Sequence, residues 1–168
     1  FSGLQVFDVP CDVRDPKQVE NAVRFANDLL GGIDFLVNNA GVLGRTGKKI
    51  DEYGLEEWSL VLDTNLRGTF LMTQAVWRTM TFHGYGKIVC VGSIAGRTGG
   101  LLAGPHYCAS KAGIHAFVKW AAKQGAPLGI YVNGVAPGPI DTLMIENQPY
   151  SRNMVPLGRL GAPADVAE

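Results

Sequence analysis

Short apolar runs and longer amphipathic windows follow one another along the chain, and each kind of pattern indicates a different element. Three apolar runs bounded by turn-forming residues predict strands, at residues 33–37, 87–91 and 130–135. Three windows with apolar residues at three- and four-residue steps predict helices, at residues 16–30, 55–82 and 107–124. A further short extended segment is expected at residues 5–13.

The first predicted helix has the clearest boundary signals. Asp15 precedes Pro16, and an aspartate N-cap followed by proline at the first helical position is typical of a helix start. Gly31 and Gly32 follow the last apolar residue and predict the helix end. In the second window, Gly68 weakens the middle of the expected helix.

The order of the elements predicts the fold class. Strands and helices alternate, and the strands are apolar throughout rather than on every second residue. This pattern is typical of a parallel sheet that is covered on both faces. We therefore expect an α/β fold, a doubly wound parallel sheet with helices on both faces, in a single domain over residues 1–168.

Composition narrows the classes of partner. The 168 residues are 46% hydrophobic, and 15 Lys and Arg balance 15 Asp and Glu, so the charge favours neither a nucleic acid nor an anionic membrane as partner. No apolar run approaches the roughly 18 residues of a membrane span. The cysteines and histidines show no metal-ligand spacing, so we expect no metal. Cys90 lies in an apolar run and is expected to be a buried thiol; the unpaired cysteines and the lack of a leader predict a cytoplasmic protein.

Small and polar residues follow each predicted strand. These strand ends read Asn38-Asn39-Ala40-Gly41, Gly92-Ser93-Ile94-Ala95-Gly96 and Ala136-Pro137-Gly138-Pro139-Ile140-Asp141-Thr142. In open parallel sheets, ligands bind just beyond the carboxyl ends of the strands. Each segment alone would also suit a plain turn, but three on one sheet edge predict a ligand site.

Tyr107 and Lys111 are spaced to act together. They are four residues apart in a predicted helix, so both side chains project from the same face. The helix follows the strand end that carries Ser93, and the three side chains can therefore converge. A nearby ammonium favours the phenolate, which would make Tyr107 an acid or base near neutral pH.

Five motifs or single residues follow one another along the chain: Asn38-Asn39-Ala40-Gly41, Asn65, Ser93, Tyr107-Cys108-Ala109-Ser110-Lys111 and Pro137-Gly138. In order and approximate spacing the set resembles the short-chain dehydrogenase/reductase family, over nearly the whole chain. The resemblance implies a Rossmann-like sheet and an oxidoreductase that transfers a hydride between NAD or NADP and a small-molecule ketone or secondary alcohol, of the 3-ketoacyl or the sugar and polyol type.

The resemblance also implies four catalytic residues. Tyr107 exchanges the proton with the substrate oxygen, and Lys111 lowers the tyrosine pKa and holds the nicotinamide ribose. Ser93 orients the substrate oxygen. Asn65 supports a proton-relay water near the lysine; as an alternative it only caps or kinks its helix.

By the same resemblance, further residues contact the cofactor. Asp12 and Val13 flank the adenine, although Asp12 would equally suit a cap on the approach to the first helix. Asn39, Ala40 and Gly41 lie along the adenosine ribose. The remaining members cover the nicotinamide and are Pro137, Gly138, Ile140 and Thr142.

Three expectations concern the surroundings of the site. Residues 143–155 correspond to the substrate lid of the family, or form a plain surface loop. His106 is expected to be a solvated loop histidine rather than a residue that faces substrate. The helices at 55–82 and 107–124 are apolar on more than one side, so we expect a homo-oligomer, a dimer or tetramer.

One family feature is not found in residues 1–168. No glycine-rich pyrophosphate turn precedes the first helix, and the choice between NAD and NADP is read from that region. We therefore expect the domain to be incomplete at both ends, without the N-terminal strand-helix-strand and the last strand. Two alternatives to a reductase remain, namely an inactive cofactor-binding regulator or scaffold, and an inactive fragment.

Overall fold

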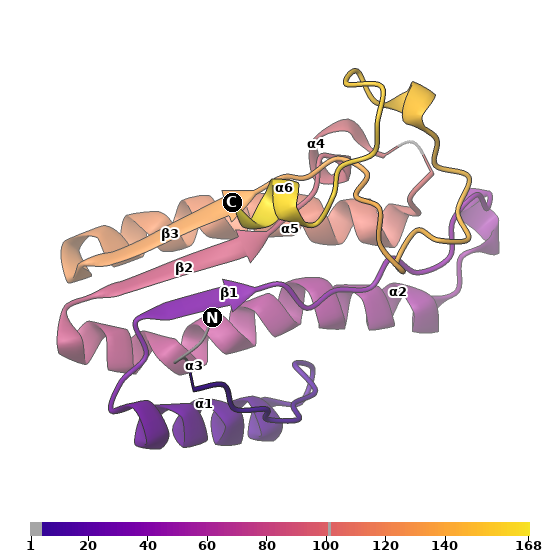
Figure 1. Ribbon diagram of the computed structural model, residues 1–168. Helices are drawn as coiled ribbons and strands as arrows, with labels where there is room; N and C mark the ends of the chain where they lie inside the picture. Colours follow the sequence, from indigo (N-terminus) through magenta and orange to yellow (C-terminus); the bar gives the residue numbers. More distant parts are fainter. Residues whose placement is uncertain (1–4, 101) are drawn as a thin grey trace.

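Three parallel strands form the centre of the computed structural model, which describes residues 5–100 and 102–168 (Figure 1). The strands are β1 (Phe35–Asn38), β2 (Gly86–Val91) and β3 (Ile130–Val135), in the order β1-β2-β3. Val89 lies opposite Val37 of β1 and Asn133 of β3. The three strands predicted from apolar runs are thus confirmed, with shifts of one or two residues at the ends of β1 and β2.

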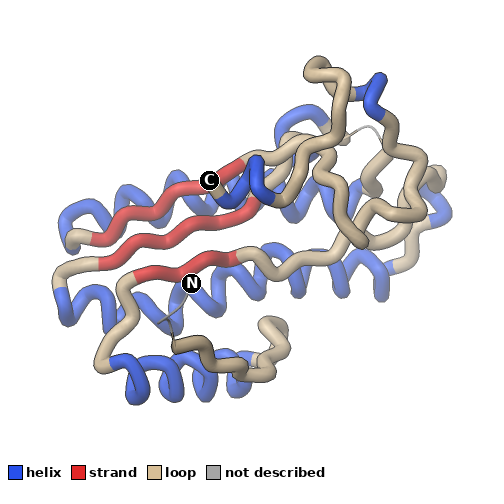
Figure 2. Tube along the Cα trace, viewed as in Figure 1, coloured by secondary structure: helices blue, strands red, loops and turns tan. Residues whose placement is uncertain are grey.

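Helices pack along the sheet and beyond its edge. The α-helices are α1 (Pro16–Leu30), α2 (Leu55–Leu62), α3 (Gly68–His83), α4 (Ala95–Thr98), α5 (Pro105–Gly125) and α6 (Ala164–Ala167). The shorter turns of helix are η1 (Ile50–Glu52), η2 (Asp63–Arg67), η3 (Ala126–Leu128) and η4 (Arg152–Met154). Figures 1 and 2 show α3 and α5 behind the sheet, α1 beside α3, and the short α6 in front. Among the described residues, no helix is both long enough and apolar enough to cross a membrane.

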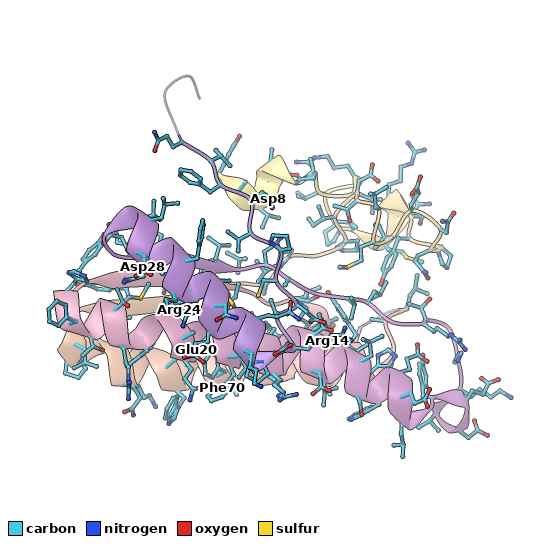
Figure 3. All side chains as sticks on the ribbon, turned by 90° about the horizontal axis from the view of Figure 1, so that it is seen from below. Asp8, Arg14, Glu20, Arg24, Asp28 and Phe70 are labelled. Carbon is cyan, nitrogen blue, oxygen red and sulfur yellow. The ribbon has the colours of Figure 1, made fainter. Side chains whose placement is uncertain are left out.

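The predicted capping of α1 is confirmed. The Asp15 carboxylate accepts hydrogen bonds from the amides of Lys17 and Gln18, and Gly31 ends the helix at φ 74°. Val19 and Val23 are buried. In Figure 3 the charged side chains labelled on α1 lie on its outer surface: Glu20, Arg24 and Asp28. The helix therefore adds an amphipathic cover outside α3.

The core lies between the sheet and the α3–α5 layer. Its buried members include Val76, Met80, Ile88, Cys90, Ile114, Ala121, Ile130 and Val132. Burying one such large apolar side chain stabilises the fold by about 1.5–3 kcal/mol. The burial expected for Cys90 is confirmed. The other face of the sheet carries Phe35, Val37 and Tyr131, and these three side chains are largely exposed.

Two local features differ from the sequence-based expectation. The helix expected at 55–82 is interrupted by η2, a single π-helical turn, rather than weakened at Gly68. A Cβ at Gly68 would lie 2.7 Å from Cγ2 of Val13, so glycine is needed there for close approach of the N-terminal segment. Residues 5–13 form no strand, and Val6 is 88% exposed.

Candidate active site

The carboxyl ends of the three strands surround a cleft of about 880 Å³, as the parallel-sheet rule predicts. Of the residues predicted to act at the site, nine line the cleft: Asn39, Gly41, Ser93, Tyr107, Lys111, Pro137, Gly138, Ile140 and Thr142. They come from all three strand ends and from α5. The long loop after β3 lies over this end of the sheet in Figure 2.

Close backbone packing brings Ser93 to α5. The Gly92 amide donates to the Val135 carbonyl at 2.8 Å, and the Ile94 amide donates to the Pro137 carbonyl at 3.0 Å. These bonds join the two strand ends. A Cβ at Gly96 would lie 2.6 Å from the backbone nitrogen of Ala112, so only glycine allows α4 to pack this closely on α5.

The half-buried Tyr107 is held as a neutral phenol. Burial raises the pKa of its hydroxyl, and the nearby Tyr150 and Cys108 add to the rise, whereas a hydrogen bond with Ser93 opposes it. The resemblance implies that Lys111 lowers this pKa, and that role stays a prediction. The Lys111 Nζ atom lies 5.6 Å from the centre of the tyrosine ring, and burial is the dominant influence.

Lys111 places a cation in a largely apolar setting. The side chain is 4% exposed, and its ammonium donates a hydrogen bond of 2.7 Å to the Val91 carbonyl. Burial lowers the pKa of Lys111 to about 8, with a small opposing effect from Cys90. A buried cation in a cleft with a strongly lowered pKa is characteristic of functional sites.

Asn65 lies behind the cleft rather than in it. The side chain is completely buried in the π-helical turn η2, and its Oδ1 accepts from the Val42 amide at 2.8 Å. Its Nδ2 donates to the Val42 carbonyl at 2.9 Å and to Ser110 Oγ at 3.0 Å. A Cβ at Gly41 would come within 3.3 Å of Asn65 Oδ1 and 3.6 Å of Lys111 Nζ. Asn65 therefore fixes the wall of the cleft next to Lys111. It also lies in the π-helical turn that interrupts the helix, which agrees with the alternative that Asn65 kinks its helix.

The residues expected near the adenine are separate from the cleft. Both carboxylate oxygens of Asp12 accept hydrogen bonds from the Arg14 guanidinium, at 2.6–3.0 Å. These bonds lower the pKa of Asp12 to about 2. Asp12 does not cap α1, because Asp15 does so. Val13 packs near Gly68, and Ala40 is exposed beside the cleft.

The structure also places His106 and segment 143–155, two regions near the cleft. The expectation of a solvated His106 is wrong, because the residue lies in the first turn of α5 and is completely buried. Met144, Tyr150 and Met154 of segment 143–155 line the cleft, which favours a substrate-facing role over a plain surface loop. Within residues 5–100 and 102–168, no group of three or more His, Cys, Asp or Glu side chains is arranged to hold a metal ion.

The chain is similar to known reductases over most of its length. It is 38% identical over 161 residues to the 3-oxoacyl-(acyl-carrier-protein) reductase FabG of Vibrio cholerae, covering 93% of this chain and 65% of that protein. It is 38% identical over 155 residues to the acetoacetyl-CoA reductase of Shinella zoogloeoides, covering 89% of this chain and 63% of that protein. The chain thus spans roughly two thirds of the length of these relatives.

Structural and family comparisons lead to the same group. The crystal structure of a short-chain type dehydrogenase/reductase from Mycobacterium marinum superimposes with a TM-score of 0.91 at 35% identity, covering 98% of this chain and 66% of that one. The family model described as short chain dehydrogenase matches residues 2–153. The parallel sheet, its helices and these matches together define a Rossmann-like α/β fold, and the chain belongs to the short-chain dehydrogenase/reductase family of oxidoreductases.

Proposed function

We propose that this chain carries the catalytic residues of a reductase that uses NAD or NADP to interconvert a ketone and a secondary alcohol. The observation that carries the proposal is the presence of Ser93, Tyr107 and Lys111 in one cleft, with a neutral phenol beside a buried amine. The names of the relatives, a 3-oxoacyl reductase and an acetoacetyl-CoA reductase, support reduction of a ketone.

The cleft fits the nicotinamide end of such a cofactor. Among the described residues, the Lys111 ammonium donates one hydrogen bond, to Val91, and an ammonium has three N–H donors. The others are available to ribose hydroxyl groups in the cleft. Gly41 and Gly138 leave backbone accessible from the same cleft, and Pro137, Ile140 and Thr142 would cover the ring. A nicotinamide bound here supplies the hydride that the reaction requires.

Tyr107 is suited to give a proton to the substrate oxygen. Because burial raises the pKa of its hydroxyl, the phenol keeps its proton at neutral pH and can donate it as negative charge develops on the oxygen. Ser93 lines the same cleft and is close enough to influence the pKa of this phenol, so its hydroxyl is placed to donate to the same substrate oxygen. The protonation state therefore favours reduction over alcohol oxidation near pH 7.

Lys111 and Asn65 support this proton transfer. After Tyr107 has donated its proton, the charge of the buried Lys111 ammonium, 5.6 Å from the centre of the tyrosine ring, stabilises the phenolate. Asn65 keeps the Val42 backbone and Ser110 in place behind the lysine, and we assign it the support of the proton path.

The lining of the cleft favours an apolar substrate chain over a polyol. Leu43, Ile94, Met144, Met154 and Val155 face the cleft together with Tyr107, so a sugar would leave several hydroxyl groups without partners. We therefore place the 3-ketoacyl type ahead of the sugar and polyol type.

Assembly into a dimer or tetramer through α3 and α5 is part of the proposal. Phe70 of α3 and Trp120 of α5 are 42% and 60% exposed, and Phe70 packs edge-on against Phe117 with ring centres 6.2 Å apart. Light scattering on the purified protein at micromolar concentration tests this, since a monomeric mass would contradict it.

The experiment for the function is oxidation of NADPH or NADH by the purified protein in the presence of a 3-oxoacyl thioester. We expect ketone-dependent oxidation with at least one of the two cofactors, and slower oxidation with a keto sugar. An inactive cofactor-binding regulator would instead quench or enhance cofactor fluorescence without any ketone-dependent oxidation, and that outcome would overturn the proposal.

A further inference from the structure

His106 occupies a closed slot next to the proposed proton donor. The side chain is 0% exposed and does not line the cleft. A Cβ at Gly44 would lie 2.7 Å from its Cε1 atom, and a Cβ at Gly104 would lie 2.6 Å from the same atom. Gly44 also has a φ of 72°, a conformation that side chains rarely adopt. The Tyr53 ring packs edge-on against the imidazole at 5.1 Å. Two glycines and an aromatic ring thus hold the imidazole in one orientation.

The two ring nitrogens of His106 have different surroundings. The N-cap of α5 is Gly104, which has no side chain to accept from the first-turn amides. The Tyr107 amide instead donates to Nδ1 of His106 at 2.7 Å. An imidazole nitrogen that accepts carries no proton, so in the neutral ring the hydrogen is on Nε2. Nε2 lies 3.4 Å from Oε1 of Glu57 but makes no hydrogen bond among the described residues, so the carboxylate is the nearby charge that this buried N–H faces.

Glu57, on α2, connects His106 to the loop formed by residues 44–49. Its Oε1 also accepts the Arg45 amide at 2.5 Å, and its Oε2 lies 3.7 Å from the Lys48 ammonium. Burial alone would raise the pKa of Glu57, but the hydrogen bond from the Arg45 amide, the nearby His106 ring and the charge of Lys48 lower it overall. Glu57 is therefore a carboxylate at neutral pH, and it fixes the start of this loop.

The same loop reaches the segment that faces the substrate side of the cleft. Thr46 Oγ1 donates a hydrogen bond to the side-chain oxygen of Gln148, which lies 102 residues further along the chain. Gln148 belongs to segment 143–155, whose Met144, Tyr150 and Met154 line the cleft. A continuous series of polar contacts thus runs from the Tyr107 amide through His106, Glu57 and Arg45 to Thr46 and Gln148.

We propose that His106 and Glu57 are positioning residues, which tie the first turn of α5 to loop 44–49 and, through Thr46 and Gln148, hold segment 143–155 over the substrate. The catalytic half of this statement rests on the proposed function, whereas the coupling between the loop and the segment does not. None of these four residues touches the reacting atoms. These residues instead fix the position of Tyr107 relative to the side chains of segment 143–155 that face the substrate.

Hydrogen–deuterium exchange of the purified protein measures the coupling without any substrate. Thr46→Val removes the donor to Gln148, and Glu57→Leu removes the acceptor for the Arg45 amide and the carboxylate that faces His106. Each is expected to speed exchange in segment 143–155 by roughly two- to tenfold, the factor that one net hydrogen bond provides. Glu57→Gln keeps an acceptor oxygen and should retain most of the protection. Glu56→Leu and Thr81→Val, at exposed helical positions, are the matched controls and should leave exchange in this segment unchanged.

Kinetics then tests the positioning role. For Thr46→Val and Glu57→Leu, we expect the KM for the ketone to rise roughly two- to tenfold, by more than kcat falls, and the affinity for the nicotinamide cofactor to stay the same. His106→Leu, which also leaves the Tyr107 amide without its acceptor, should lower kcat in addition. If His106→Leu does not fold, the Thr46 and Glu57 variants still decide the question.

The two proposals fail in different ways. Absence of ketone reduction in the wild type, with faster exchange in both variants, would overturn the proposed function and leave the coupling intact. Unchanged exchange in segment 143–155 for both Thr46→Val and Glu57→Leu would overturn the positioning proposal, whether or not the protein reduces ketones. Equal loss of protection in Glu57→Gln and Glu57→Leu would also contradict it, because the acceptor oxygen would then not matter.

Discussion

Lys111 and Asp12 are both charged residues that the family resemblance assigns to the cofactor, and the structure treats their charges in opposite ways. The Lys111 ammonium is buried in the cleft wall and bonds only a backbone carbonyl among the described residues. Asp12 lies near the surface, and Arg14, two residues away, bonds both of its oxygens. One charge depends on the folded sheet, and the other is satisfied within a three-residue segment.

The pKa of each group is lowered, but for different reasons. Burial lowers the pKa of Lys111 to about 8 by disfavouring its charged form, whereas Arg14 lowers the pKa of Asp12 to about 2 by favouring its charged form. A charge that the fold holds at a cost is a strong indication of function, and a surface ion pair contributes little to stability or to specificity. The comparison therefore assigns the chemistry to the Lys111 side of the molecule.

Lys111→Met should give the largest change in stability with pH. The lysine releases its proton near pH 10.5 when unfolded and at about pH 8 when folded, so between these values the unfolded state binds more protons. The wild type is thus penalised below pH 8 and gains about 3 kcal/mol of unfolding free energy as the pH rises through this window. Urea denaturation across the window should show this gain in the wild type and not in the variant.

The control for this comparison is Lys119→Met, which removes an exposed lysine from the same helix. Parallel stability curves for the wild type and Lys111→Met between pH 8 and 10.5 would show that Lys111 is not buried as a strained cation.

Asn65→Leu should have the next largest effect. The change removes both hydrogen bonds to the Val42 backbone and the bond to Ser110, and it leaves the partly buried amide and carbonyl of Val42 without these partners, whereas Ser110 keeps its bond to the Tyr107 carbonyl. We expect a loss of about 2–4 kcal/mol of unfolding free energy, measured by urea denaturation at neutral pH. Asn21→Leu, at an exposed position on α1, is the matched control. A cost equal to that of the control would mean that the wall behind Lys111 does not depend on this amide.

Asp12→Asn should have the smallest effect. Its ion pair with Arg14 is exposed, so we expect only a slight fall in Tm at neutral pH. The folded-state pKa of Asp12 is lowered, so the pair stabilises the protein above the usual aspartate range and loses its effect as the pH falls toward 2. Thermal melts of variant and wild type should therefore converge in acid. A destabilisation as large as the pH-dependent change expected for Lys111 would break the contrast between the buried and the exposed charge.

Local signals were enough to predict most elements and the position of the site. Asp15, Pro16 and Gly31 mark the ends of α1 within the sequence itself. Apolar runs locate the strands. Because the carboxyl ends of parallel strands meet at one edge of the sheet, the segments that follow them can be placed together from the sequence alone. Tyr107 and Lys111 share a helix face through their spacing alone.

Features that depend on distant contacts could not be predicted. His106 reads as a loop histidine because nothing near it in the sequence shows that Gly44 closes over its ring. Asn65 falls in an ordinary amphipathic window, and its π-helical turn is associated with side-chain bonds to Val42 and Ser110, more than 20 residues away in each direction. The link between Thr46 and Gln148 has no sequence signal at all.

The central claim is that Tyr107 gives the proton in ketone reduction, and the rate of Tyr107→Phe tests it most directly. The measurement is steady-state oxidation of the preferred nicotinamide cofactor with a 3-oxoacyl thioester, beside Tyr131→Phe, which removes the hydroxyl of an exposed tyrosine on β3. We predict that kcat falls about 10²–10⁴-fold in Tyr107→Phe, with cofactor affinity unchanged, and stays at the wild-type value in Tyr131→Phe. Turnover by Tyr107→Phe at the wild-type rate would contradict the account.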